Sequence, residues 1–294
     1  MAAQATRMAF DERLTTAARN AGSLVCVGLD PDLERFPVHL RNQPDAILRF
    51  NTAIVDATRD LVCAYKPNLG HYLAHGVAGL AALAATRDLI PAGIPVILDC
   101  KVNDMASTSA AYARGYFDTL GADAVTANPF LGEEALAPFL SRPDRGVILL
   151  CKTSNPGSGE LQDLLVHGDA GDTPLYLAIA ERAAAWAERS AATVGLVVGA
   201  TYPAQLAEVR RRCPTLPILL PGIGAQGGDL DASLTAGLDA DGAGLIVSAS
   251  RSILYAGDGL DFADRARDAT LQLRDAIRTA SAGARPIARA ALPG

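Results

Sequence analysis

Short apolar runs recur along the chain, and each has the length and the β-branched content of a strand. Because these runs are apolar at almost every position, rather than at alternate positions, they are typical of a parallel sheet that is covered on its outside. The pattern predicts eight strands, at residues 24–30, 62–67, 95–101, 123–129, 146–152, 194–200, 217–222 and 243–250.

Alanine- and leucine-rich stretches separate the predicted strands, and their apolar residues recur with helical spacing, as in residues 44–61 and 173–191. The chain thus repeats a strand–helix unit eight times. This number favours a closed (β/α)8 TIM barrel over an open doubly wound α/β sheet, because closure removes both edges of the sheet. No G-x-G-x-x-G sequence follows the first predicted strand, which weakens a dinucleotide-binding alternative.

The length of 294 residues fits a single barrel domain, which we assign to residues 1–280. Two segments differ from the barrel pattern. Residues 166–173 are rich in glycine and aspartate and interrupt the fifth strand–helix connection, so they are a candidate for a mobile lid. Residues 281–294 are rich in alanine and proline, and we expect a flexible tail there.

The composition narrows the classes of function. A net charge of −6 and a pI of about 5.2 argue against nucleic acid or an anionic membrane as a partner, since both require a basic surface. The apolar runs are too short to span a membrane, and the first 20 residues lack the apolar core of a secretory signal. The five cysteines are odd in number and lack C-x-x-C spacing, which predicts structural thiols in a reducing cytoplasm.

Charged residues end three adjacent predicted strands, at the face where barrels carry their functional groups. Asp99 and Lys101 end the third strand and point to one side of it, Lys66 ends the second, and Asp30 ends the first. An Asp-x-Lys pair is often only an ion pair. However, charges at the mouth of an apolar barrel have to be paired, and such clusters are typical of functional sites. Both interpretations stay open at this point.

The loop PGIGAQGG after the seventh predicted strand has the composition of a phosphate-binding loop. Its glycines permit close backbone approach, and Gln226 offers an amide donor. Arg251, after the eighth strand, offers a guanidinium that can bind phosphate through two hydrogen bonds. A tight entry into the following helix would also explain the glycines, but the combination with Arg251 favours phosphate binding.

Several motifs together resemble the orotidine 5′-phosphate decarboxylase family. The Asp99-x-Lys101-x-x-Asp104 run, with Lys66 on the preceding strand, is similar to the charged tetrad of that family. Met105, where members commonly carry isoleucine, is a departure that leaves the charged groups unchanged. The length resembles the longer bacterial (type 2) branch. The similarity in order and spacing extends over residues 28–37, 64–68, 98–108, 151–158, 219–229 and 247–256.

The resemblance implies cofactor-free decarboxylation of orotidine 5′-monophosphate to uridine 5′-monophosphate and CO2, the last step of de novo pyrimidine biosynthesis. Without a cofactor, the barrel must stabilise the developing carbanion with preorganised charge. By resemblance, Lys101 is the proton donor to C6 of the pyrimidine and is held by Asp99 and Asp104. Asp99 would lie near the departing carboxylate, and Lys66 would contact the ribose or that carboxylate.

The same resemblance places Ser154 against the pyrimidine ring, and Asp30 and Thr108 at the ribose hydroxyls. In the family, Asp104 and Thr108 reach into the site of the neighbouring subunit, so a homodimer with shared active sites is implied. We expect no metal cofactor, because none of the four histidines forms a metal-binding spacing with carboxylates: His39, His71, His75 and His167.

Two other functions stay open. A related barrel that acts on sugar phosphates through a magnesium-stabilised enediolate has a similar Asp-x-Lys-x-x-Asp run. Such barrels carry a carboxylate where this chain has Lys66, and a cation at that position would repel Mg²⁺. A non-catalytic phosphate-binding barrel would keep Gln226 and Arg251 but would not need four convergent charges.

Overall fold

The computed structural model describes residues 8–168, 171–223 and 228–283. Eight parallel strands form its main sheet. Each strand overlaps one of the eight predicted runs, so the predicted strand pattern is confirmed. The strands are β1 Val25–Leu29, β2 Ala64–Pro67, β3 Ile97–Val102, β4 Ala124–Ala127, β5 Gly146–Lys152, β8 Thr193–Val198, β9 Ile218–Pro221 and β10 Leu245–Ala249.

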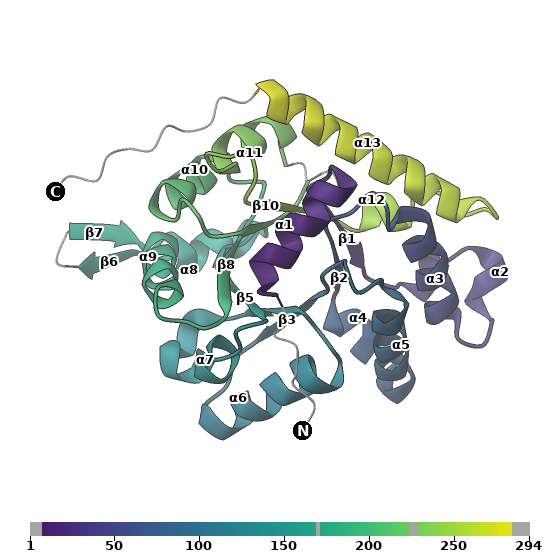
Figure 1. Ribbon diagram of the computed structural model, residues 1–294, viewed down its shortest axis with the longest axis horizontal. Helices are drawn as coiled ribbons and strands as arrows, with labels where there is room; N and C mark the ends of the chain where they lie inside the picture. Colours follow the sequence, from purple (N-terminus) through teal and green to yellow (C-terminus); the bar gives the residue numbers. More distant parts are fainter. Residues whose placement is uncertain (1–7, 169–170, 224–227, 284–294) are drawn as a thin grey trace.

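The sheet closes on itself. Its strand order is β2-β1-β10-β9-β8-β5-β4-β3, and the two strands at the ends of this order meet through two parallel bridges, Tyr65 to Val96 and Asn68 to Asp99. Helices surround the strands (Figure 1). The predicted single TIM barrel is therefore confirmed. Because one bridge joins Asn68, directly after β2, to Asp99 of β3, closure brings the charged residues of these two strands side by side.

Each strand contributes one buried side chain to the barrel interior. These side chains form a buried cluster that is separate from the larger core between the strands and the outer helices. Since strand side chains alternate, residues two positions further along each strand also face inward, toward the C-terminal mouth of the barrel. The inner residues are Cys26, Ala64, Ile97, Ala124, Ile148, Val197, Leu219 and Ile246.

Helix α1 (Phe10–Ala21) crosses the N-terminal end of the barrel (Figure 1). Phe10 packs into the inner cluster, beside Gly146 at the start of β5, where an added Cβ would approach the ring to 2.6 Å. Arg13 Nη1 lies 2.7 Å from Oδ1 of Asp123, a buried carboxylate just before β4. This helix therefore seals one end of the barrel and leaves the C-terminal mouth for function. The sequence pattern did not predict this role for the N-terminal segment.

The remaining helices cover the outside of the barrel, in the alternation with strands that the sequence predicted (Figure 1). A 22-residue helix, α13, ends the described chain. The helices are α2 Val38–Arg41, α3 Ala46–Thr58, α4 Leu69–Leu73, α5 Gly76–Leu89, α6 Ala106–Ala113, α7 Glu133–Leu140, α8 Gly159–Gln162, α9 Leu175–Ala187, α10 Pro203–Arg212, α11 Leu230–Gly237, α12 Arg251–Leu254 and α13 Phe262–Gly283. A π-helix, η2 Arg114–Thr119, continues α6, and three short 3-10 helices are η1 Leu33–Arg35, η3 Pro129–Leu131 and η4 Pro156–Ser158.

The two segments that differ from the barrel pattern have definite structure where they are described. Strands β6 (Leu165–Gly168) and β7 (Gly171–Pro174) form an antiparallel hairpin beside α9 (Figure 1). The expected lid at residues 166–173 is thus largely a hairpin, and whether it moves stays a prediction. Helix α13 continues three residues beyond the domain boundary expected at residue 280. Residues 284–294 of the expected tail lie outside the described residues.

All five cysteines are free, and four are buried. Burial raises the pKa of Cys26 to about 12 and that of Cys213 to about 11, which keeps both thiols protonated and unreactive at neutral pH. Among the described helices, none combines the length and apolar character that crossing a membrane requires.

Candidate active site

A cavity of about 570 Å³ opens at the C-terminal ends of the barrel strands. It lies at the face where (β/α)8 barrels carry their functional groups. Its wall includes residues from the ends of most of the strands. Six of the residues predicted from sequence line it: Asp30, Lys66, Asp99, Lys101, Ser154 and Arg251.

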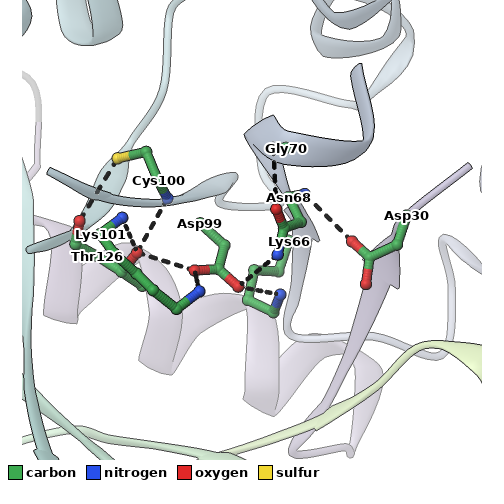
Figure 2. A network of polar contacts seen from close by, with 8 residues as sticks. All are labelled: Asp30, Lys66, Asn68, Gly70, Asp99, Cys100, Lys101 and Thr126. Carbon is green, nitrogen blue, oxygen red and sulfur yellow. Dashed lines mark hydrogen bonds and ion pairs between the residues drawn. The ribbon is translucent and has the colours of Figure 1, made fainter. Parts of the chain in front are cut away.

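Three charged side chains that line this cavity contact one another (Figure 2). Lys66 Nζ lies 2.9 Å from Oδ2 of Asp99, and Lys101 Nζ lies 2.6 Å from Oδ1 of the same carboxylate. The Lys66 and Asp99 side chains are 6% and 12% exposed, whereas that of Lys101 is 50% exposed. One buried carboxylate therefore anchors two ammonium groups, and only Lys101 extends into the open part of the cavity.

The ionisation of this array follows from its geometry. Burial alone would raise the pKa of Asp99, but Lys66 and Lys101 outweigh burial and hold that pKa below its ordinary value. Burial would lower the pKa of Lys66, but Asp99 and Asp30 reverse this and hold it above its ordinary value. At neutral pH, Asp99 is therefore a carboxylate and Lys66 an ammonium group.

The backbone of Lys101 departs from strand geometry, with a φ of +49°. The pairing of β3 with β4 shifts register at this point, between Leu98 and Val102. Thr126 on β4 supports the irregular backbone. Its Oγ1 accepts hydrogen bonds from the amides of Cys100 and Lys101, at 3.0 and 2.9 Å, and donates one to Oδ1 of Asp99 at 3.0 Å (Figure 2). One threonine hydroxyl therefore fixes both the carboxylate and the backbone of Lys101.

Asn68 links the charged array to the end of β1 (Figure 2). Its backbone amide donates to Oδ1 of Asp30 at 3.1 Å, and its Nδ2 donates to Oδ2 of Asp99 at 3.3 Å. Its Oδ1 accepts from the amide of Gly70 and caps α4. Tyr255, after α12, donates to the carbonyl oxygen of Asp30 at 2.9 Å. Asp30 is thereby fixed beside the array, as the position of its strand predicts.

Asp104 and Thr108 do not join the array within one chain. In the described structure Asp104 Oδ1 accepts from the amide of Met105, and no ion pair between Asp104 and Lys101 is found. Thr108 lies exposed on α6, and neither residue lines the cavity. Within one chain Asp104 is therefore not paired with Lys101, and the expectation that it holds a Lys101 side chain stays a prediction about the neighbouring subunit.

Of the two residues predicted to bind phosphate, Arg251 lies within the described residues and Gln226 does not. Arg251 begins α12 and lines the cavity with its neighbours Ser250 and Ser252. Gly222 and Ile223, at the start of the glycine-rich loop, also line it. Gln226 lies outside the described residues.

Several cavity residues were not singled out from the sequence. Asn68 and Thr126 follow the inner residues of β2 and β4 at even spacing, so strand alternation is the signal that would have found them. The others had no such signal, because loops and short helices that follow the strands bring them to the cavity: Asp32, Arg35, His71, Thr153, Asn155, Gln162 and Tyr255. His71 is among them, and its Nδ1 lies 3.2 Å from the carbonyl oxygen of Pro31.

The cavity wall carries four Lys and Arg side chains and three carboxylates, together with amide and hydroxyl groups. Within the described residues, no group of three or more His, Cys, Asp or Glu side chains is arranged to hold a metal ion. Such a surface is suited to an anionic small molecule.

Comparison with known proteins gives a consistent result. A family model described as "Orotidine 5'-phosphate decarboxylase / HUMPS family" matches residues 23–266. The chain is 62% identical over 270 residues to orotidine 5′-phosphate decarboxylase of Thermomicrobium roseum, with 92% of this chain and 95% of that protein covered.

Solved structures agree in fold and in sequence. The structure of Leishmania donovani OMP decarboxylase superposes with a TM-score of 0.80 at 42% identity, covering 93% of this chain and 99% of that one. Leishmania donovani UMP synthase gives a TM-score of 0.82 at 43% identity, covering 93% of this chain but only 57% of that longer one.

Proposed function

The chain belongs to the orotidine 5′-phosphate decarboxylase / HUMPS family and is an orotidine 5′-phosphate decarboxylase by its relatives. From this premise we propose the reaction that it catalyses. It converts orotidine 5′-monophosphate to uridine 5′-monophosphate and CO2, the last step of de novo pyrimidine biosynthesis, and it needs no cofactor. The observation that carries the proposal is the Lys66–Asp99–Lys101 array in the barrel mouth.

Lys101 is the proton donor in this proposal. When the bond between C6 and the carboxylate carbon breaks, CO2 leaves and an electron pair stays on C6. That pair takes a proton from Nζ of Lys101, and the neutral amine then recovers a proton from water. A preorganised ammonium group stabilises the charge at C6 as it develops, which lowers the barrier. The half-exposed position of Lys101 in the cavity supports this role.

Asp99 and Lys66 support Lys101 in distinct ways. Asp99 stays ionised, so it orients Lys101 and lies near the departing carboxylate of the substrate. Lys66 balances the charge of Asp99 and faces the ribose or the substrate carboxylate. Asp30 then contacts a ribose hydroxyl, and Ser154, from the loop after β5, reads the edge of the pyrimidine. The presence of all these residues on one cavity wall supports the assignment.

A homodimer with shared sites completes the proposal. Asp104 and Thr108 lie outside the cavity of their own chain, in a region that exposes large apolar side chains. Met105 is 66% exposed and Phe130, on η3, is 86% exposed. A second copy packed on this surface would bury these side chains and bring its Asp104 and Thr108 to the first copy's Lys101. Neither residue has a cavity role without such a partner.

Phosphate binding by Gln226 and Arg251 is proposed to raise the rate as well as the affinity. Binding energy from a group remote from C6 can drive closure of the predicted lid at residues 166–173 over the cavity and so act in the transition state. The position of Arg251 on the cavity wall supports this site.

A cytoplasmic location is part of the proposal, supported by the five free thiols. Membership of the longer bacterial (type 2) branch stays a prediction.

A magnesium-dependent sugar-phosphate enzyme is the main alternative. In such a site a carboxylate would stand at the end of the second strand, where this chain places the buried ammonium group of Lys66. A cation there disfavours Mg²⁺ and favours an anionic substrate. A non-catalytic phosphate-binding barrel, in turn, leaves the Lys66–Asp99–Lys101 array without a role.

One experiment separates these functions. EDTA-treated protein is mixed with orotidine 5′-monophosphate and the loss of the orotate absorbance is followed, with Lys101→Ala in parallel. We expect metal-independent turnover that falls by at least about 10³-fold in the variant. Wild-type protein that binds the nucleotide without turnover would instead support the binding protein, and turnover of sugar phosphates that requires Mg²⁺ would support the alternative enzyme.

A further inference from the structure

Lysine is rare in this chain, and its positions are informative. Among 26 Lys and Arg residues only three are lysine, and each is the last or next-to-last residue of a barrel strand: Lys66, Lys101 and Lys152. Two of them form the charged array of the cavity. The third, Lys152, is the last residue of β5 and has no part in the proposed chemistry. All other cationic Lys and Arg positions of the chain are arginine. Lys152 is therefore a position at which the chain has a compact ammonium group and not a guanidinium group.

The side chain of Lys152 is completely buried. Its Nζ lies 2.6 Å from Oδ1 of Asp163, 4.6 Å from the ring centroid of Tyr202 and 5.8 Å from that of Tyr176. A buried ammonium group is costly unless a carboxylate and hydrogen-bonding or aromatic groups surround it. The surroundings of Lys152 meet this requirement, and Asp163 is the one carboxylate that pairs with it in the described chain.

The ion pair joins the two ends of one loop. Lys152 precedes residues 153–162, and Asp163 follows them directly after α8. A second pair of contacts lies next to the ion pair: the amide of Thr153 donates to Oε1 of Gln162 at 2.9 Å, and Nε2 of Gln162 donates to Oγ1 of Thr153 at 2.8 Å. The loop is therefore closed at its base by one ionic and two polar contacts.

The same loop forms part of the cavity wall. Thr153, Ser154, Asn155 and Gln162 line the cavity. On its other side the loop packs against the end of β8, where Tyr202 donates from its hydroxyl to the carbonyl oxygen of Asn155 at 3.3 Å. The Tyr202 ring also contacts the ammonium group of Lys152. Tyr202 therefore contacts both the ion pair at the base of the loop and the backbone of the loop at Asn155.

We propose that Lys152 is a positioning residue, which with Asp163 holds the loop of residues 153–162 against the cavity so that Ser154 is in place before the nucleotide binds. This inference rests on the proposed function, since it takes the loop to read the pyrimidine. Breaking the pair releases the base of the loop and leaves the phosphate and ribose contacts at the other strand ends intact. The pyrimidine therefore loses its contacts selectively.

The test compares two ligands and the free protein. Lys152→Met keeps the length of the side chain without the charge, and Asp163→Asn removes the partner. Asp60→Asn is the matched control, because Asp60 is also about half exposed and also pairs at 2.6 Å, with Arg267, but lies before β2 at the opposite end of the barrel. For each protein we measure the Kd of uridine 5′-monophosphate, the Kd of ribose 5-phosphate and amide hydrogen exchange of the free chain.

For both loop variants, we expect the Kd of uridine 5′-monophosphate to rise by between about 10- and 100-fold, while that of ribose 5-phosphate is unchanged. Amide protection is expected to fall over residues 153–163 alone, and the control should behave as wild type. Equal weakening of both ligands, or unchanged exchange of the loop, would overturn the proposal. If Asp163→Asn, which leaves the buried ammonium group of Lys152 unpaired, does not fold, the double variant K152M/D163N, which leaves no unpaired buried charge, replaces it.

The exchange measurement also separates this proposal from the proposed function. It needs no ligand, so it decides whether Lys152 holds the loop even if the wild-type protein fails to decarboxylate orotidine 5′-monophosphate. Turnover by wild type together with an unaffected loop in both variants would leave the proposed function intact and overturn only the role of Lys152.

Discussion

The Nζ atom of Lys101 lies 2.6 Å from the Oδ1 atom of Asp99, although the two residues belong to the same strand and one residue separates them. In a regular strand these side chains would stand side by side, perpendicular to the sheet. Here Lys101 has a φ of +49°, a conformation that costs a non-glycine residue about 1–3 kcal/mol. Contacts from β4 therefore have to maintain the arrangement.

Thr126 provides these contacts, so its hydroxyl is expected to be needed for activity. Thr126→Val keeps the shape of the side chain and removes the hydrogen bonds to Asp99 and to the amides of Cys100 and Lys101. We expect kcat for orotidine 5′-monophosphate to fall by about 10- to 100-fold, because Lys101 loses its position. Steady-state kinetics check this, with Thr126→Ser, which keeps the hydroxyl, as the control. A valine variant as fast as the serine variant would contradict the role of the hydroxyl.

The Asp99 carboxylate predicts a pH dependence of stability. Its pKa in the folded protein is held below the ordinary value of 3.8, so the ion pairs stabilise the native state fully above that value. This stabilisation is lost as the pH falls below about 4 toward the folded-state pKa. Thermal unfolding of wild type and Asp99→Asn from pH 3 to 7 measures it. We expect the difference in Tm to be constant above about pH 5 and to shrink in acid; a difference that does not change down to pH 3 would contradict it.

Arg251 is expected to act on the phosphate of the substrate. Arg251→Ala should lower kcat/KM for orotidine 5′-monophosphate by about 10- to 100-fold, because a charge-assisted hydrogen bond is lost. The rate with orotidine, which has no phosphate, should not change. Arg182→Ala, on the exposed face of α9, is the control. Equal losses for both substrates would assign Arg251 to general stability of the site and not to phosphate binding.

The shared-site dimer predicts complementation between two inactive variants. Lys101→Ala and Asp104→Asn are each expected to be inactive, since one loses the proton donor and the other the carboxylate given to the partner. In a mixed dimer, one of the two sites has both residues intact. Mixing equal amounts under conditions of subunit exchange should therefore restore about one quarter of wild-type activity, the share for random pairing. A mixture no more active than its components would show that each chain builds its own site.

The apolar pattern of the sequence was sufficient to predict the barrel. Each strand is a short run whose burial on both faces is visible locally, and each overlaps its predicted range. The pattern was not sufficient for α1, because its role depends on Phe10 filling a barrel interior to which all the strands contribute. It also did not predict the β6–β7 hairpin, since a glycine- and aspartate-rich segment suits a loop equally well.

The candidate site divides in a similar way. Lys66, Asp99 and Lys101 could be assigned because side-chain alternation and the end of each strand are properties of neighbouring residues in the sequence. Asn68 and Thr126 were within reach of the same rule. Asp163 could not be predicted by this rule, because its contact with Lys152 depends on the path of a ten-residue loop.

By itself, the sequence determined the eight strand–helix units, their closure into a barrel and the charged residues at the strand ends, because periodicity and burial act over short stretches of chain. Only the tertiary structure decided that Asp99 is shared between two lysines, that Thr126 maintains the unusual backbone of Lys101, and that Asp104 does not line the cavity of its own chain. These features depend on which strands become neighbours and where the pairing of β3 with β4 shifts, and no local pattern of residues encodes such long-range contacts.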